Sequence, residues 1–104
     1  MVDLSFHFQG VCWLWSGEKA AWVFIRLPEE KSAEIQFLNE NLHEKKRGWG
    51  VVKVVATIGQ TTWQTSIFPD KKSGCYLLPI KASVRKAEHF SVGSAVNVHL
   101  SINL

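Results

Sequence analysis

The stretch from residue 48 to residue 69 constrains the fold more than any other, because it predicts a β-hairpin with a tight turn. It reads GWGVVKVVATIGQTTWQTSIFP. On its first arm, apolar side chains occupy every second position: Val52, Val54, Ala56 and Ile58. Gly59 supplies the positive φ that a two-residue turn between Ile58 and Thr61 requires. An isolated hairpin is marginally stable in water, so the rest of the chain must cover it.

The segments before the hairpin predict two strands and a helix. Residues 4–15 alternate up to Gly10, where the apolar phase moves to Val11, Trp13 and Trp15, so a bulge or a sharp bend is expected there. Residues 20–27 are apolar at nearly every position, which is typical of a strand covered on both faces. Residues 29–43 follow Pro28 and predict an amphipathic helix. Its expected apolar stripe consists of Ile35, Phe37, Leu38 and Leu42.

The segments after the hairpin predict a strand at 75–78, a helix at 80–89 and a strand at 95–104. A polar turn at 70–74 leads into the first of them. In the second helix, Val84 and Ala87 are expected to face inward. Lys81, Arg85 and Glu88 are expected to share its exposed face. The last strand alternates cleanly, with Val96, Val98, Leu100, Ile102 and Leu104 predicted to point inward.

The order of the predicted elements repeats: strand, strand, helix, strand, and then the same series again. Leu27-Pro28 and Leu78-Pro79 lie at matching points, each between a strand and a helix. Two interlocking ββαβ units would close a sheet and hide its edges. We therefore predict one mainly-β domain over residues 1–104, a six-stranded double-split (pseudo-)barrel with two helices at about 29–43 and 80–89.

Composition and charge narrow the setting of this domain. A chain of 104 residues has the length of one domain, and its net charge of +3 is uneven. Residues 48–104 hold six basic and two acidic side chains, which makes this half a candidate for contact with an anion. No apolar run approaches the roughly 18–20 residues of a membrane span. The first residues lack the features of a signal peptide, so we expect a cytoplasmic protein without membrane contact.

Cysteine and histidine give little sign of chemistry. Cys12 and Cys75 lie far apart in sequence, and two reduced, buried thiols are expected. Four histidines are scattered without metal-ligand spacing on any one element: His7, His43, His89 and His99. We therefore expect no metal and no cofactor. No nucleophile elbow or phosphate loop is present, so an enzyme of unknown class is the third hypothesis for function.

Several segments together resemble a known family. They are GWG-VVKVVATIG, WQTSIFP, Tyr76-x-LPIKASVRKAE and VNVHLSI, with Phe8-x-Gly10 and Trp22-x-Phe24 in the first half. The pattern resembles DUF1905, a bacterial and archaeal domain of unknown function, and the part from Trp49 to Arg85 is the most specific. Gly59-Gln60 and Gly93-Ser94 depart from the usual turn residues. The resemblance implies a double-split pseudo-barrel and no particular activity. Residues 77–98 are also similar to the swapped-hairpin DNA-binding proteins of the AbrB/MazE type.

The candidate site predicted from the residues is a ligand-binding one. Trp49 and Trp63 would provide stacking surfaces, Thr65 and Ser66 hydrogen-bonding hydroxyls, and Lys81 and Arg85 cations for an anion. In the alternative interpretation, Trp63 packs in the core and Thr65 is present because threonine favours β-strands.

The leading interpretation is a non-enzymatic module that binds a small polar or anionic ligand, as a monomer or a homodimer. The alternative is an AbrB-like dimeric nucleic-acid-binding protein. It would place Lys53, Lys81, Arg85 and Lys86 on phosphates and stack tryptophans on bases.

Overall fold

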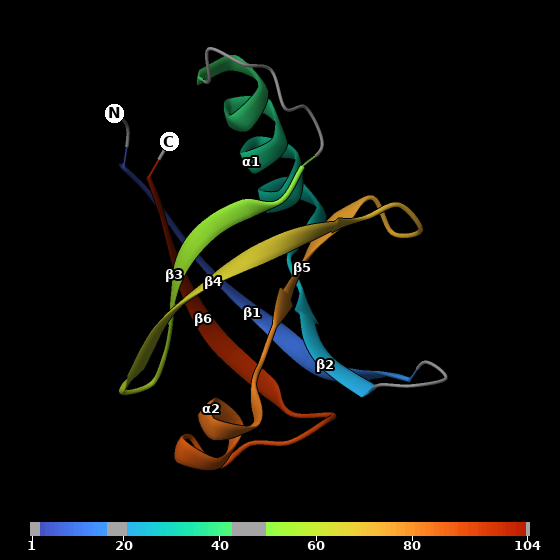
Figure 1. Cartoon of the computed structure of the whole chain (residues 1–104), viewed down its shortest axis with the longest axis vertical. Coiled ribbons are helices and arrows are strands. Elements are labelled where there is room, and N and C mark those ends of the chain that lie inside the picture. The colour runs from blue at the N-terminus through green and yellow to red at the C-terminus, as the bar shows by residue number, and fades with distance from the viewer. Residues whose placement is uncertain (1–2, 17–20, 43–49, 104) are drawn as a thin grey trace.

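The described residues close into a β-barrel with a helix near each end (Figure 1). The structure is a computed structural model that describes residues 3–16, 21–42 and 50–103. In this part of the chain there are six strands and two helices. They are β1 (Asp3–Ser16), β2 (Ala21–Arg26), α1 (Glu29–Leu42), β3 (Val52–Ile58), β4 (Thr61–Asp70), β5 (Cys75–Pro79), α2 (Ala82–Ala87) and β6 (Ala95–Asn103).

The strand order around the barrel is β1-β2-β5-β4-β3-β6, and every neighbouring pair is antiparallel. The predicted sequence of elements and the closure of the sheet are therefore confirmed. Exchanging β1 with β4, β2 with β5 and β3 with β6 leaves the strand order of the barrel unchanged. The β2–β5 and β3–β6 pairs then map onto themselves, as expected for two similar halves that interlock.

The central hairpin forms as predicted. β3 and β4 pair from Val52 opposite Ile67 to Ile58 opposite Thr61, and Gly59 in the turn has a φ of 58°. All four alternating apolar side chains of β3 are buried, and so are Val96, Val98, Leu100 and Ile102 of β6. These two strands supply much of the core because alternation places one complete apolar face inside a closed sheet.

The expected bulge at Gly10 is wrong. β1 pairs with β6 in an unbroken register through Gly10, and its inward series continues from Phe6 and Phe8 to Cys12. Gly10 is instead a point of close approach, because a Cβ atom there would overlap Cγ2 of Ile25. The apolar series that begins at Val11 therefore faces outward.

The expected burial of both faces of the second strand is also wrong. Val23 and Ile25 are buried, but Trp22 and Arg26 on the opposite face of β2 are exposed. The continuous apolar character of this segment thus does not come from coverage on both sides.

Helix α1 covers one end of the barrel and is anchored to β5 (Figure 1). Ile35 and Ser32 are fully buried, and the Ser32 hydroxyl accepts a hydrogen bond from the backbone N–H of Tyr76 at 3.0 Å. Phe37 was expected to widen the buried stripe, but 63% of its surface is exposed. The side chain of Leu42 lies outside the described residues.

Helix α2 lies at the other end of the barrel (Figure 1) and is shorter than predicted. Val84 faces inward as expected, whereas Ala87, the last residue of this six-residue helix, is exposed. The Thr61 hydroxyl donates a hydrogen bond of 2.6 Å to the carboxylate of Glu88. This bond joins the end of α2 to the turn of the central hairpin.

Two further predictions concern the thiols and the membrane. Cys12 and Cys75 are both free and buried, as expected. Neither helix of the described residues is long and apolar enough to cross a membrane. The predicted inward position of Leu104 lies outside the described residues.

Candidate functional site: an aromatic hollow on the outer wall

The most prominent feature of the barrel surface is a group of aromatic rings on β1 and β2. In the β1–β2 ladder, Trp13 lies opposite Phe24 and Trp15 lies opposite Trp22. Cross-strand partners project to the same face, so these four rings gather on the outer wall. The ring centroids of Trp13 and Phe24 are 5.6 Å apart, and those of Trp22 and Phe24 are 6.5 Å apart.

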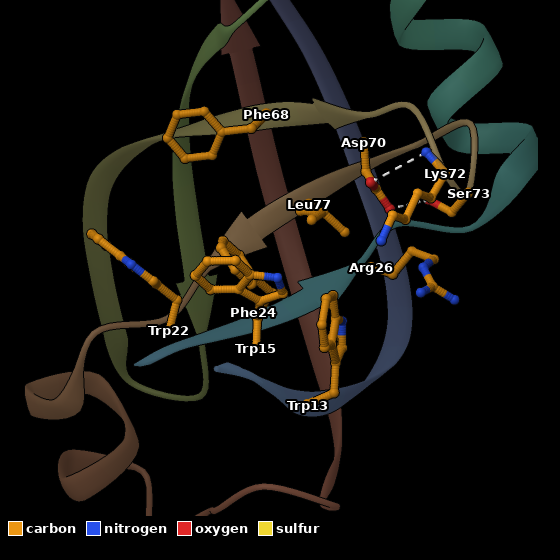
Figure 2. Close-up of a pocket in the computed structure, with 10 residues that line it drawn as sticks. All are labelled: Trp13, Trp15, Trp22, Phe24, Arg26, Phe68, Asp70, Lys72, Ser73 and Leu77. Atoms are coloured by element: carbon orange, nitrogen blue, oxygen red, sulfur yellow. Dashed lines mark hydrogen bonds between the residues drawn. The ribbon is translucent and has the colours of Figure 1, made fainter. Parts of the chain in front are cut away.

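The same face continues across β5 to β4. Arg26 of β2 lies opposite Leu77 of β5, and Leu77 lies opposite Phe68 of β4. Together these strands and the turn after β4 enclose a hollow of about 860 Å³, which we call the aromatic hollow (Figure 2). Its lining consists of Trp13, Trp15, Trp22, Phe24, Arg26, Phe68, Asp70, Lys72, Ser73 and Leu77.

Three of these rings are strongly exposed. The exposed fractions are 48% for Trp15, 53% for Trp22 and 41% for Phe68. Single exposed apolar side chains are normal on a protein surface, but a cluster of large rings with a charged neighbour is typical of an interaction site. Packing of the barrel does not require these rings, because the interior is filled by the opposite faces of the same strands.

Arg26 provides a cation beside the rings. Its guanidinium carbon lies 5.7 Å from the centre of the Trp13 ring, within the range of a cation–π contact. In Figure 2, Arg26 lies on the side of the hollow where Trp13 and the β4–β5 turn are found. An anion bound at this end of the hollow would therefore meet a positively charged side chain and an aromatic wall together.

Asp70 forms the rigid corner of the β4–β5 turn. Its carboxylate accepts hydrogen bonds from the Ser73 hydroxyl at 2.8 Å and from the backbone N–H of Lys72 at 3.4 Å (Figure 2). The Ser73 hydrogen bond is the largest of the effects that lower the pKa of Asp70 below its ordinary value, and the nearby Arg26 contributes to them. Asp70 is therefore ionised at neutral pH and holds the turn that carries Lys72.

Trp13 carries an unused donor. Its indole Nε1 is buried and has no hydrogen-bond acceptor among the described residues. A buried N–H without a partner costs free energy, on the order of 1–3 kcal/mol.

Comparison with known proteins assigns the family. Residues 8–100 match DUF1905, a domain of unknown function. The chain belongs to the DUF1905 family. Among curated proteins, none matches this sequence. The resemblance stated from segments along the whole sequence is thereby confirmed, and the family assignment itself carries no activity.

Three of the predicted site residues in this DUF1905 domain line a second hollow. Trp63 and Thr65 of β4 and Lys81, just before α2, face a space of about 330 Å³ that we call the Lys81 hollow. Trp63 belongs mainly to the core, since only 9% of its surface is exposed, and its indole reaches the hollow from inside. This space lies where β4 and β5 diverge, since the two strands pair only from Phe68 opposite Leu77 onward.

The other predicted residues lie apart from the Lys81 hollow. Ser66 lines a third space of about 860 Å³, together with Lys53 of β3, which we call the Lys53 hollow. Arg85 lines none of these three spaces. It is half-buried, its Nε has no hydrogen-bond partner among the described residues, and its charge acts on Cys12. Trp49 lies outside the described residues.

The three hollows adjoin one another at Phe68, which lines all of them, and Trp22 lines two. The aromatic hollow is not predicted from the sequence, because the pattern of residues 20–27 indicates a strand covered on both faces and the phase change after Gly10 indicates a bulge or bend. The signal for it was the change of apolar phase after Gly10. Within residues 3–16, 21–42 and 50–103, no three His, Cys, Asp or Glu side chains gather to hold a metal ion.

Proposed function

We propose that this protein is a non-enzymatic binding module for a small anionic ligand that carries a planar ring. The observation that carries the proposal is the aromatic hollow, where exposed rings share one space with Arg26, whose guanidinium lies beside the Trp13 ring. Its volume of about 860 Å³ lies within the range typical of small-molecule sites.

Each part of the ligand has a counterpart in the hollow. A planar ring would stack on Trp22 or Phe24, whose rings are nearly parallel with an interplanar angle of 19°. The anionic group would pair with Arg26 beside the Trp13 ring. Asp70 would disfavour ligands with a second negative charge close to the β4–β5 turn.

The site predicted from the sequence is part of this proposal. Thr65 and Lys81 extend the aromatic hollow past Phe68, so substituents of the ligand would reach them, and Ser66 lies on the Lys53 side. We also propose that the barrel is of the double-split kind. Support comes from its strand order, which is unchanged when the two halves are exchanged.

Tryptophan fluorescence tests the function directly. The probes are adenosine monophosphate, which has a ring and an anion, and its two halves, adenosine and inorganic phosphate. We expect the nucleotide to quench the fluorescence at lower concentration than either half. Arg26→Gln should weaken binding of the nucleotide and leave binding of adenosine unchanged, whereas Trp22→Ala should weaken binding of both.

Two matched controls come from outside the hollow. Phe37→Ala removes an exposed ring from α1, and Lys86→Gln removes an exposed cation from α2. Neither should alter binding. Absence of nucleotide binding, or equal losses in the control and hollow variants, would refute the proposed function.

A further inference from the structure

The aromatic hollow is part of a larger surface, and we infer that this surface binds single-stranded nucleic acid. The inference rests on the proposed function and specifies its ligand as a strand of planar bases linked by phosphates. Three observations carry it: the width of the aromatic surface, the distribution of charge around it, and the position of the rings on a strand wall.

The rings cover more than one nucleotide. They extend from Trp13 on β1, across β2 and β5, to Phe68 on β4. Three strand spacings of about 4.8 Å make a width of about 14 Å. Each base stacks on one aromatic face at a time. A mononucleotide would therefore leave part of the surface uncovered, whereas a strand of several nucleotides would cover it.

Cations surround the rings where phosphates would lie. Arg26 and Lys72 line the aromatic hollow, Lys53 lines the Lys53 hollow and Lys81 lines the Lys81 hollow. Because the three hollows meet at Phe68, these cations surround the rings from different sides. Among the described residues that line the three hollows, Asp70 is the one carboxylate. Rings with a basic margin are how proteins hold single strands, by stacking the bases and pairing the phosphates.

The position of the rings favours single strands over a duplex. Trp15 and Trp22 project from the outer wall of the barrel and are about half exposed. Only bases that are free of a partner strand can lie flat on them. A duplex would meet the lysines through its phosphates and leave the rings in water, so it would gain charge contacts without stacking.

Fluorescence anisotropy with labelled oligothymidylates and oligouridylates of increasing length tests the inference. A hairpin duplex of the same nucleotide count and thymidine monophosphate serve as comparisons. We expect the affinity to rise with length until the surface is covered, and to exceed that of the duplex. With four cations engaged, the logarithm of the binding constant should fall with the logarithm of salt concentration at a slope of about −3.

Variants separate stacking from charge. Trp22→Ala and Phe68→Ala should each lower the affinity for an oligonucleotide about ten- to hundredfold, with the salt dependence of binding unchanged. Lys53→Gln and Lys81→Gln should each make the salt slope shallower by about 0.7. The control variants Phe37→Ala and Lys86→Gln should bind as the parent protein does, and circular dichroism should show the same fold in every variant.

The outcomes distinguish this inference from the proposed function. If the monophosphate binds but longer strands bind no better, the inference is wrong and the proposed function stands. If the duplex binds as tightly as the single strand, or if Trp22→Ala and Phe68→Ala lose no affinity, the inference is wrong as well. If neither the monophosphate nor any oligonucleotide binds, both proposals fall.

Discussion

Replacing Ser32 by alanine should destabilise the barrel through one hydrogen bond. The backbone carbonyl of Tyr76 accepts a hydrogen bond from the backbone N–H of Leu27 at 2.9 Å. The N–H of Tyr76 therefore also points toward the segment that follows β2. Pro28 turns the chain into α1 at this point, and the Ser32 hydroxyl accepts that N–H at 3.0 Å. Ser32 therefore completes the β5 ladder in place of a strand carbonyl.

The expected loss is about 2 kcal/mol. Ser32→Ala is nearly isosteric, and it removes the hydrogen bond between the Ser32 hydroxyl and the backbone N–H of Tyr76 in a site where both residues are fully buried. An unpaired buried donor costs about 1–3 kcal/mol. In a domain of this size each kcal/mol lowers Tm by about 4–8 °C, so about 2 kcal/mol corresponds to about 8–16 °C.

Urea and thermal unfolding measure the loss, and hydrogen exchange locates it. The amide of Tyr76 should lose more protection than its neighbours in β5. Ser83→Ala, on the exposed surface of α2, is the matched control and should change stability by less than about 0.5 kcal/mol. Equal stabilities for the Ser32 and Ser83 variants, with unchanged exchange at Tyr76, would refute the argument.

Three further predictions follow from buried side chains. Trp63→Ala should cost about 3–5 kcal/mol in urea unfolding, because the indole belongs to the core, and a loss below about 1 kcal/mol would assign Trp63 to the ligand alone. Burial, with a smaller effect of Glu40, raises the pKa of Tyr76 to about 12. The unfolded chain releases the Tyr76 proton at a pH near 10, whereas the folded protein keeps it until about pH 12. The free energy of unfolding should therefore fall as the pH rises from about 10 to 12. The phenolate absorbance of this single tyrosine measures its pKa in the folded protein. Burial raises the pKa of the Cys12 thiol against the opposing charge of Arg85, and Cys75 is also buried, so neither should react with a thiol reagent at neutral pH until urea unfolds the protein.

The inner side of the barrel was predictable from the sequence because its signal is local. Alternation in β3 and β6 assigns each side chain to a face, and Gly59 determines the turn between β3 and β4. The repeated order of elements predicted closure of the sheet, and the strand order confirms it. These features need no knowledge of distant contacts.

The site was less predictable because apolar character does not say which face of a strand is covered. Trp22 and Ile25 are both large apolar residues of one apolar segment, yet Ile25 is fully buried and Trp22 is about half exposed. Trp63 shows the opposite case, since it was predicted as a stacking surface and packs mainly in the core. Only pairing between strands decides such cases, and β5 between them places Arg26 and Phe68 on the same hollow.

The outward face of β1 contains its own comparison. In the first half of the strand, the exposed outward side chains are Ser5, His7 and Gln9, and His7 stacks on His99 of β6 at 4.2 Å. Beyond Gly10, the same face of the same strand carries Trp13 and Trp15.

Both halves of β1 face the barrel interior with their other side chains, so the needs of the core do not explain the difference. A polar outer face is the ordinary outcome for an antiparallel sheet in water. The aromatic half departs from it only beside Arg26 and the neighbouring strands of the hollow. Since exposed rings add little to folding, we attribute the change at Gly10 to the binding role proposed above for these rings. Trp22→Ala should accordingly reduce binding far more than it reduces the free energy of unfolding.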